Sequence, residues 1–129
     1  MKEKLPKPQL SSFVLFRDGQ ERRLEIDEKI TLSLGEGSDE DHSIVSLEIL
    51  PSQKYLNARI YYKNGGMVFF PWGLTKKRHD SDEEVFGVGL TSWALSTEGD
   101  KRTLRGSNVY FDEHHLRLSG ENWHVDYKP

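Results

Sequence analysis

Apolar and polar residues alternate along most of the chain with a period of two. The clearest runs are residues 24–26, 30–34, 45–49 and 56–62, in which every second residue is apolar. Successive side chains of a β-strand point to opposite faces, so this period predicts strands with one buried face. An amphipathic helix would space its apolar positions three and four apart, and no run of the chain does so. The pattern therefore predicts an all-β fold.

Short turn signals between these runs predict antiparallel hairpins. Asp18-Gly19 follows the apolar run 13–16, and Asn64-Gly65-Gly66 follows the alternating run 56–62. Asparagine, aspartate and glycine tolerate the positive φ values of tight hairpin turns, so both signals favour a reversal of the chain.

The last hairpin has the most explicit expected register. A two-residue loop of Gly120 and Glu121 would place Leu118 opposite Trp123 on the buried face. The opposite face of this hairpin would then carry four polar side chains, His115, Arg117, His124 and Asp126.

Two prolines are expected to end strands, because proline has no N–H to donate to a sheet. These are Pro51 and Pro71. Residues 85–97 favour either one bent strand or two strands that meet at a bulge, since glycines interrupt them. The total is about nine or ten strands. The alternation does not distinguish an antiparallel β-sandwich from a small β-barrel.

The length of 129 residues suits one domain. We expect a flexible N-terminal segment at residues 1–10 and a single all-β domain at residues 11–129. The absence of cysteine excludes a disulfide scaffold and fits a reducing compartment. The sequence shows no secretory leader and no long uncharged stretch, so we expect a soluble cytoplasmic protein without membrane contact.

The charge is balanced overall but unevenly distributed. Eighteen basic and 21 acidic side chains give a net charge of −3, which argues against a nucleic-acid binder. Acidic residues gather in two expected loops, and the calcium-binding loop pattern is absent from both. We interpret them either as solvated charge or as a docking surface for a basic protein partner. The acidic residues concerned are Glu36, Asp39, Glu40, Asp41, Asp80, Asp82, Glu83 and Glu84.

Aromatic residues suggest two further surfaces. Tyr61 and Tyr62 must point to opposite faces of their strand, so Tyr61 beside Arg59 is a candidate partner contact. Trp72 and Trp93 are candidate walls for an apolar or carbohydrate ligand. The alternative for both tryptophans is packing in the core.

A metal site is the remaining candidate. Two histidines and one carboxylate can hold a non-haem iron, and His115, His124 and Asp126 supply that set. The alternative is a solvated sheet face. The familiar hydrolase, metalloprotease and nucleotide-binding motifs are missing, so we expect no cofactor and favour a non-catalytic protein.

Three hypotheses follow, in order of preference. The first is a protein-binding domain, in its specific form an inhibitor or immunity-type protein that covers a basic site with its acidic loops. The second is a sandwich or barrel that binds an apolar or carbohydrate ligand. The third is a metal-dependent enzyme. The sequence leaves the oligomeric state open.

Overall fold

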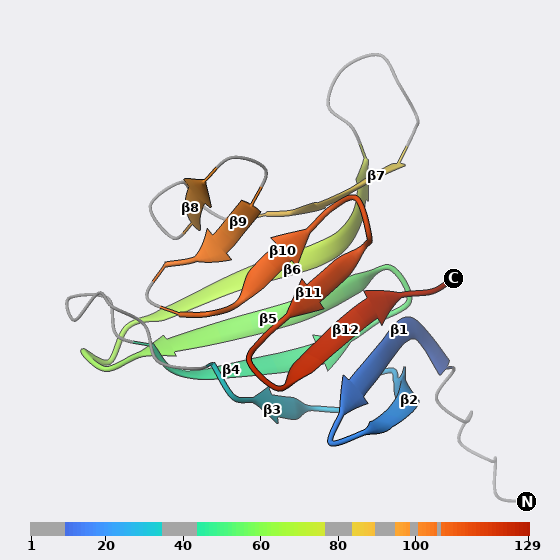
Figure 1. The fold of residues 1–129 in the computed structure, drawn as a ribbon, viewed down its shortest axis with the longest axis horizontal. Coiled ribbons are helices and arrows are strands. Elements are labelled where there is room, and N and C mark those ends of the chain that lie inside the picture. Colours follow the sequence, from blue (N-terminus) through green and yellow to red (C-terminus); the bar gives the residue numbers. More distant parts are fainter. Residues whose placement is uncertain (1–9, 35–43, 77–83, 90–94, 99–100, 106) are drawn as a thin grey trace, which may run out of the picture.

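The computed structural model describes residues 10–34, 44–76, 84–89, 95–98, 101–105 and 107–129, and these form twelve strands and no helix. Two antiparallel sheets lie face to face, with the C-terminal strands in one layer and the green central strands in the other (Figure 1). The sheets stay open at their edges, so the fold is a β-sandwich, and the all-β expectation is confirmed.

The seven-stranded sheet combines both ends of the described chain. Its order is β2-β1-β12-β11-β10-β9-β8. Its strands are β1 (Leu10–Arg17), β2 (Gln20–Glu25), β8 (Leu95–Glu98), β9 (Lys101–Leu104), β10 (Tyr110–Asp112), β11 (Arg117–Ser119) and β12 (Trp123–Tyr127).

The five-stranded sheet is a meander of consecutive strands. It contains β3 (Ile30–Leu32), β4 (Ile44–Pro51), β5 (Tyr55–Tyr62), β6 (Met67–Lys76) and β7 (Glu84–Val88), in that order. From β4 onward, each strand pairs with the strand that precedes it in the chain. The cross-strand neighbours on the outer face of this sheet therefore come from strands that are consecutive in the sequence.

The two predicted hairpin turns are present. Asp18 and Gly19 have φ values of 56° and 73° and join Arg17 to its partner Gln20. This is the left-handed pair that a two-residue hairpin turn requires. Gly65 has a φ of 90° in the turn between β5 and β6.

The core lies between the sheets and follows the predicted alternation. Leu56, Ala58 and Ile60 of β5 are fully buried, and Tyr62 is 8% exposed. Burial raises the pKa of the Tyr62 phenol above its ordinary value. The period-two pattern therefore correctly assigns the two faces of this strand.

The last hairpin differs from the expected register by two residues. Leu118 lies opposite Val125 rather than Trp123, because the backbone N–H of Gly120 donates to the carbonyl oxygen of Trp123 and moves the turn one residue along. A shift of two residues leaves every side chain on the same face. Leu118, Trp123 and Val125 are accordingly buried, as predicted.

Val45 does not join the core. The register of β4 shifts between Ile44 and Ser46, and this bulge leaves Val45 65% exposed while Ile44 packs against the core. A bulge adds one residue to one strand, so the alternation before it predicts the wrong face.

Pro71 lies inside β6 instead of ending it. Its carbonyl oxygen accepts a hydrogen bond of 3.0 Å from the N–H of Gly89, just beyond β7. The N and O atoms of a residue in an antiparallel strand point to the same side. The N–H that proline lacks would therefore point toward β7, at a position beyond the end of that strand. On its other side, Pro71 still pairs with Asn57 of β5. Pro51 does end its strand, as predicted.

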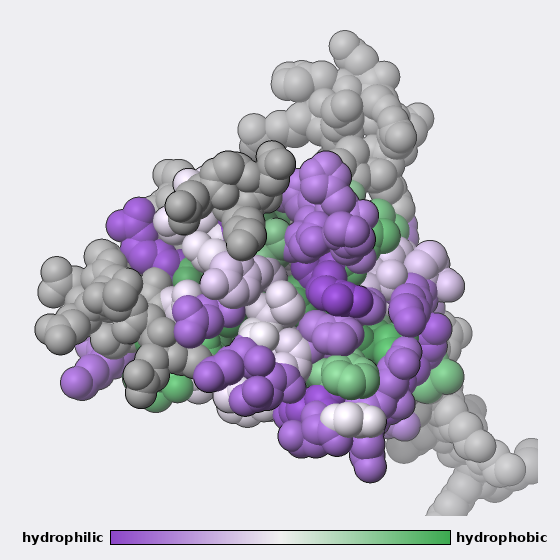
Figure 2. All heavy atoms as spheres, in the orientation of Figure 1, coloured by the Kyte–Doolittle hydropathy of each residue, from purple (hydrophilic) through white to green (hydrophobic). Residues whose placement is uncertain are grey.

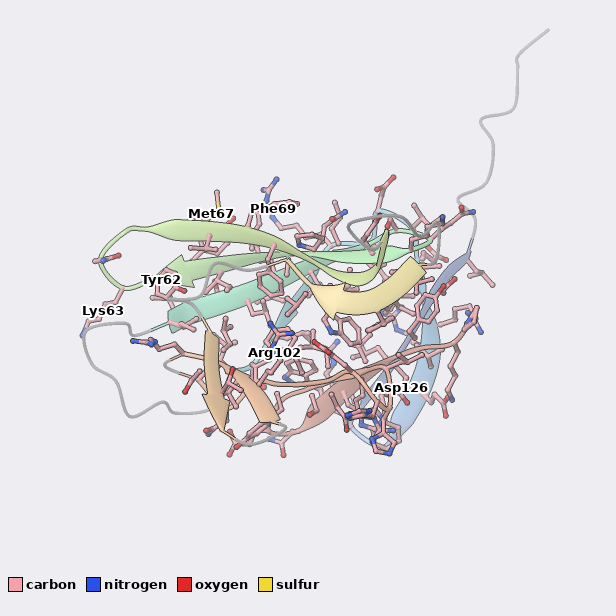
Figure 3. All side chains as sticks on the ribbon, turned by 90° about the horizontal axis from the view of Figure 1, so that it is seen from above. Tyr62, Lys63, Met67, Phe69, Arg102 and Asp126 are labelled. Carbon is pink, nitrogen blue, oxygen red and sulfur yellow. The ribbon has the colours of Figure 1, made fainter. Side chains whose placement is uncertain are left out.

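The segment 85–97 supplies strands to both sheets. β7 completes the five-stranded sheet and β8 begins the edge of the other, so neither a single bent strand nor a simple bulge describes it. β9 follows and was not expected, because Arg102 occupies an inward position opposite Phe111 and breaks the alternation. Figure 3 shows Arg102 between the layers, where it pairs with Glu113.

No described helix has the length and apolar character that a membrane crossing would require.

Candidate functional site

The outer face of the five-stranded sheet carries a row of three neighbouring side chains. Arg59 of β5 lies opposite Glu48 of β4 on one side and Phe69 of β6 on the other. Residues paired across an antiparallel ladder point to the same face. Ala58 and Ile60, the neighbours of Arg59 in the chain, are fully buried. The parity of β5 therefore turns Arg59 outward.

Two large apolar side chains lie on this face and remain more than half exposed. Met67 is 52% exposed and Phe69 is 54% exposed, whereas Phe70, the next residue of β6, faces the core and is fully buried. Both point away from the sandwich (Figure 3). Tyr61 lies directly opposite Met67 and is half-buried. We call the set Arg59, Tyr61, Met67 and Phe69 the contact face.

A groove of about 140 Å³ adjoins the contact face. It is lined by Lys29, Glu48, Ile49, Leu50, Asn57, Arg59 and Phe69. Small-molecule sites usually enclose about 300 to 1,000 Å³. The groove is therefore of the size of one large side chain rather than of a whole ligand.

Charge is unevenly paired around the groove. Lys29 Nζ lies 3.3 Å from Glu48 Oε1, while Glu48 Oε2 is buried and has no hydrogen-bond partner among the described residues. Arg59 is exposed and forms no ion pair with any residue that the structure describes. The charged side chains that line the groove, Lys29, Glu48 and Arg59, thus carry two positive charges and one negative, and Arg59 lies opposite both Glu48 and Phe69.

The outer face of the seven-stranded sheet has a different character. Figure 2 shows hydrophilic side chains gathered over β10, β11 and β12. Arg117 Nε donates to Asp126 Oδ1 at 2.7 Å, and its terminal nitrogen donates to Oδ2 at 3.1 Å. This two-pronged pairing raises the pKa of the Arg117 guanidinium. The charges on this face are largely neutralised by their own neighbours.

The three residues of the predicted metal site do not form one. His115 precedes β11 and lies in the turn after β10, where its Nδ1 is 2.7 Å from Asp112 Oδ2. That hydrogen bond is the largest cause of the lowered pKa of Asp112. His124 Nε2 lies 3.8 Å from Asp126 Oδ2, so these two residues are neighbours, but the His124 ring stacks on Phe16 at 4.9 Å between centroids and Asp126 is held by Arg117. Among the described residues, no group of three or more metal-ligating side chains is placed to hold an ion.

The predicted ligand wall at Trp72 is a core position. Trp72 is fully buried and packs against Phe13 and Phe86, with ring centroids 5.9 and 4.6 Å away. Its ring therefore has no exposed side to offer a ligand. Trp93 lies outside the described residues.

The predicted acidic docking residues lie outside the described side chains. Glu36, Asp39, Glu40, Asp41, Asp80, Asp82 and Glu83 fall in residues 35–43 and 77–83, and of Glu84 only the backbone, at the start of β7, is described. Among the described residues, β3, which precedes residues 35–43, and β6, which precedes residues 77–83, end at opposite ends of the five-stranded sheet (Figure 1). A ten-residue strand such as β6 spans about 33 Å.

The structure adds Met67 and Phe69 to the predicted contact pair. The Asn64-Gly65-Gly66 signal locates the turn between β5 and β6 but does not fix the length of its loop. The observed loop of residues 63–65 places Phe69 opposite Arg59, whereas a two-residue Asn64-Gly65 loop would place it opposite Ile60. The apolar run 67–70 was too uniform to show which of its members faces outward.

Comparisons with known proteins add no assignment, since no protein family, curated protein or solved structure matches the chain.

Proposed function

We propose that the chain is a non-catalytic protein-binding domain whose partner docks on the contact face. The observation that carries this proposal is the exposure of Met67 and Phe69 on one strand beside Arg59. Scattered apolar residues are normal on a protein surface, but adjacent large ones next to arginine are typical of interfaces. Aromatic residues, methionine and arginine are the types enriched at the centres of such surfaces.

The chemistry of the partner follows from the groove. An apolar side chain of the partner would fill the space of about 140 Å³ beside Phe69, and a carboxylate would pair with Arg59. Arginine and aromatic anchors carry most of the binding energy in interfaces of this kind. The proposed partner segment therefore combines an apolar residue with an acidic one.

The inhibitor or immunity-type form of this function remains a separate proposal. It assigns the contact to the acidic segments and a basic partner. The described strands that lead into these segments, β3 and β6, end at opposite ends of the five-stranded sheet.

Two sets of substitutions separate these forms. The immobilised protein captures partners from extracts of its native cells, and each captured protein is then purified and titrated. Phe69→Ser and Arg59→Glu should each raise the Kd at least tenfold, while Phe16→Ser, an exposed aromatic on the other sheet, should leave it unchanged. Neutralising Asp39, Glu40, Asp41, Asp82, Glu83 and Glu84 together tests the acidic segments.

The outcomes are distinct. If a captured partner binds Phe69→Ser and Arg59→Glu with unchanged Kd, the contact face is not the docking site. If only the neutralised acidic variant loses binding, and more strongly at low salt, the inhibitor-type form replaces it.

A further inference from the structure

The outer face of the seven-stranded sheet contains a second and larger depression. It lies over β10, β11 and the turn between them, and its volume is about 410 Å³. This falls within the usual range of about 300 to 1,000 Å³ for small-molecule sites. We call it the polar groove. Its side chains include Tyr110, Asp112, His114, His115, Arg117 and Ser119.

The sheet register fixes the floor of the polar groove. Tyr110 lies opposite Ser119, and Asp112 lies opposite Arg117, so two cross-strand pairs stand side by side on the same face. The Tyr110 side chain is 40% exposed. An aromatic ring and a hydroxyl therefore flank a pair of charged groups on a rigid surface.

The charged groups of the groove are held in place by hydrogen bonds within the fold. Asp112 Oδ1 accepts hydrogen bonds of 3.0 and 3.1 Å from the backbone N–H groups of His114 and His115, and Asp112 Oδ2 lies 2.7 Å from His115 Nδ1. Arg117 is fixed by its two bonds to Asp126 on the neighbouring strand. Polar groups that are ordered before binding lose little entropy when a ligand arrives.

The charge of the groove disfavours an anionic ligand. Its arginine, Arg117, is already compensated by Asp126, and Asp112 adds a further carboxylate. A phosphate or carboxylate would approach Asp112 without an uncompensated cation to offset the repulsion. A neutral ligand with many hydroxyls meets no such penalty, because a carboxylate accepts from hydroxyls, a guanidinium donates to them and a serine hydroxyl does both.

We propose that the polar groove binds a neutral sugar residue. The apolar face of the sugar ring packs on Tyr110, and the hydroxyls of the sugar form hydrogen bonds with Asp112, Arg117 and Ser119. Tyrosine suits this position because it offers a rigid apolar ring with a polar tip. This site lies on the opposite sheet from the contact face and does not depend on the function proposed above.

The test is a titration followed by amide NMR spectra of the full chain. The probes are glucose, galactose, mannose, N-acetylglucosamine and the β1,4-linked disaccharides of glucose and N-acetylglucosamine, with inorganic phosphate as the charged comparison. At least one sugar should shift the amides of residues 110–119 saturably. The Kd should be on the order of 1 mM, the affinity that a ligand of about a dozen heavy atoms commonly reaches.

Variants assign the binding to the groove. Tyr110→Ala should raise the Kd for the sugar at least tenfold, whereas Tyr110→Phe, which keeps the ring, should stay within about threefold. Leu10→Ser, an exposed apolar position at the start of β1, serves as the control and should bind as the unsubstituted protein does. Dispersed spectra of each variant show that it is folded.

Three results would overturn the proposal. One is that no sugar of the panel shifts residues 110–119. Another is that Tyr110→Ala binds as tightly as Tyr110→Phe. The third is that phosphate alone shifts these amides and binds more tightly to Asp112→Asn, which would make the groove an anion site.

Discussion

The indole Nε1 of Trp123 donates a hydrogen bond of 2.5 Å to the carbonyl oxygen of Ser33, 90 residues earlier in the chain. Trp123 belongs to β12 of the seven-stranded sheet, and Ser33 directly follows β3 of the other sheet. The bond therefore ties the two layers together where their apolar faces meet. Trp72 is also buried, but its Nε1 has no acceptor among the described residues.

The two tryptophans form a matched pair for measuring this bond. Trp123→Phe and Trp72→Phe remove the same atoms from two buried sites, so their cavity terms are comparable. Trp123→Phe also leaves the Ser33 carbonyl without its donor, whereas Trp72→Phe removes an unsatisfied N–H. We expect Trp123→Phe to lower the unfolding free energy by about 1–3 kcal/mol more than Trp72→Phe. Urea unfolding followed by far-UV circular dichroism measures both. Equal losses would mean that the bond contributes nothing net.

Gly120, in the turn before β12, leaves the space that the Trp123 indole occupies when it makes this bond. A Cβ at this position would lie 2.3 Å from Trp123 Cε2 and 2.4 Å from Nε1, so Gly120→Ala must displace the indole. We expect a loss of about 1–3 kcal/mol from overpacking. Gly87→Ala is the control, since nothing lies within 4 Å of a Cβ there, and surface changes of this kind stay within about 0.5 kcal/mol. A Gly120→Ala variant as stable as Gly87→Ala would show that the ring moves freely.

A buried serine offers a third measurement. Ser11 is 1% exposed, and its Oγ donates to the Leu24 carbonyl oxygen at 2.7 Å and accepts from the Phe13 N–H at 3.2 Å. Ser11→Ala leaves these backbone groups without that partner, so we expect a loss of about 1–2 kcal/mol. Ser12→Ala, on the other face of the same strand, should change the unfolding free energy by less than about 0.5 kcal/mol. The ranking fails if the two variants unfold at the same urea concentration.

Local rules account for most of the fold because they act over two to four residues. The positive φ values of Asp18 and Gly19 and the burial of alternate residues in β5 follow from turn chemistry and strand parity. In the last hairpin the side chains lie on the predicted faces, although the observed register differs from the predicted one by two residues. The division of the strands into two sheets was not predictable, because the pairing of β1 with β12 depends on contacts more than 100 residues apart.

The two surfaces differed in how much the sequence could show. Strand parity alone turned Arg59 and Tyr61 outward, so part of the contact face was predicted. Predicting the polar groove would have required the conformation of the turn after β10, because residues of this turn line it. In that turn Leu116 takes a φ of 51° although it is not glycine. No pattern predicts that conformation, because leucine rarely adopts it. The proposed metal site was wrong because it treated His115 as part of a regular strand.

The ion pair of Glu28 with Arg22 should make stability depend on pH on the acid side. Glu28 Oε1 lies 2.7 Å from an Arg22 nitrogen, and Oε2 accepts 2.9 and 3.0 Å hydrogen bonds from Arg22 and from the Glu25 N–H. The Arg22 hydrogen bond is the largest cause of the lowered pKa of Glu28 in the folded state, against an ordinary value of 4.5. Because the folded pKa is the lower one, the contribution is complete above pH 4.5 and is lost as the pH falls through the folded-state value. Arg22 is half exposed, so the contribution should be below about 1 kcal/mol.

Glu28→Gln should show a shallower fall of the urea midpoint between about pH 5 and pH 3 than the unsubstituted protein. Asp112, whose pKa is also lowered, leaves a residual slope in the variant. Parallel curves for the two proteins would show that the pair titrates alike in the folded and unfolded chains.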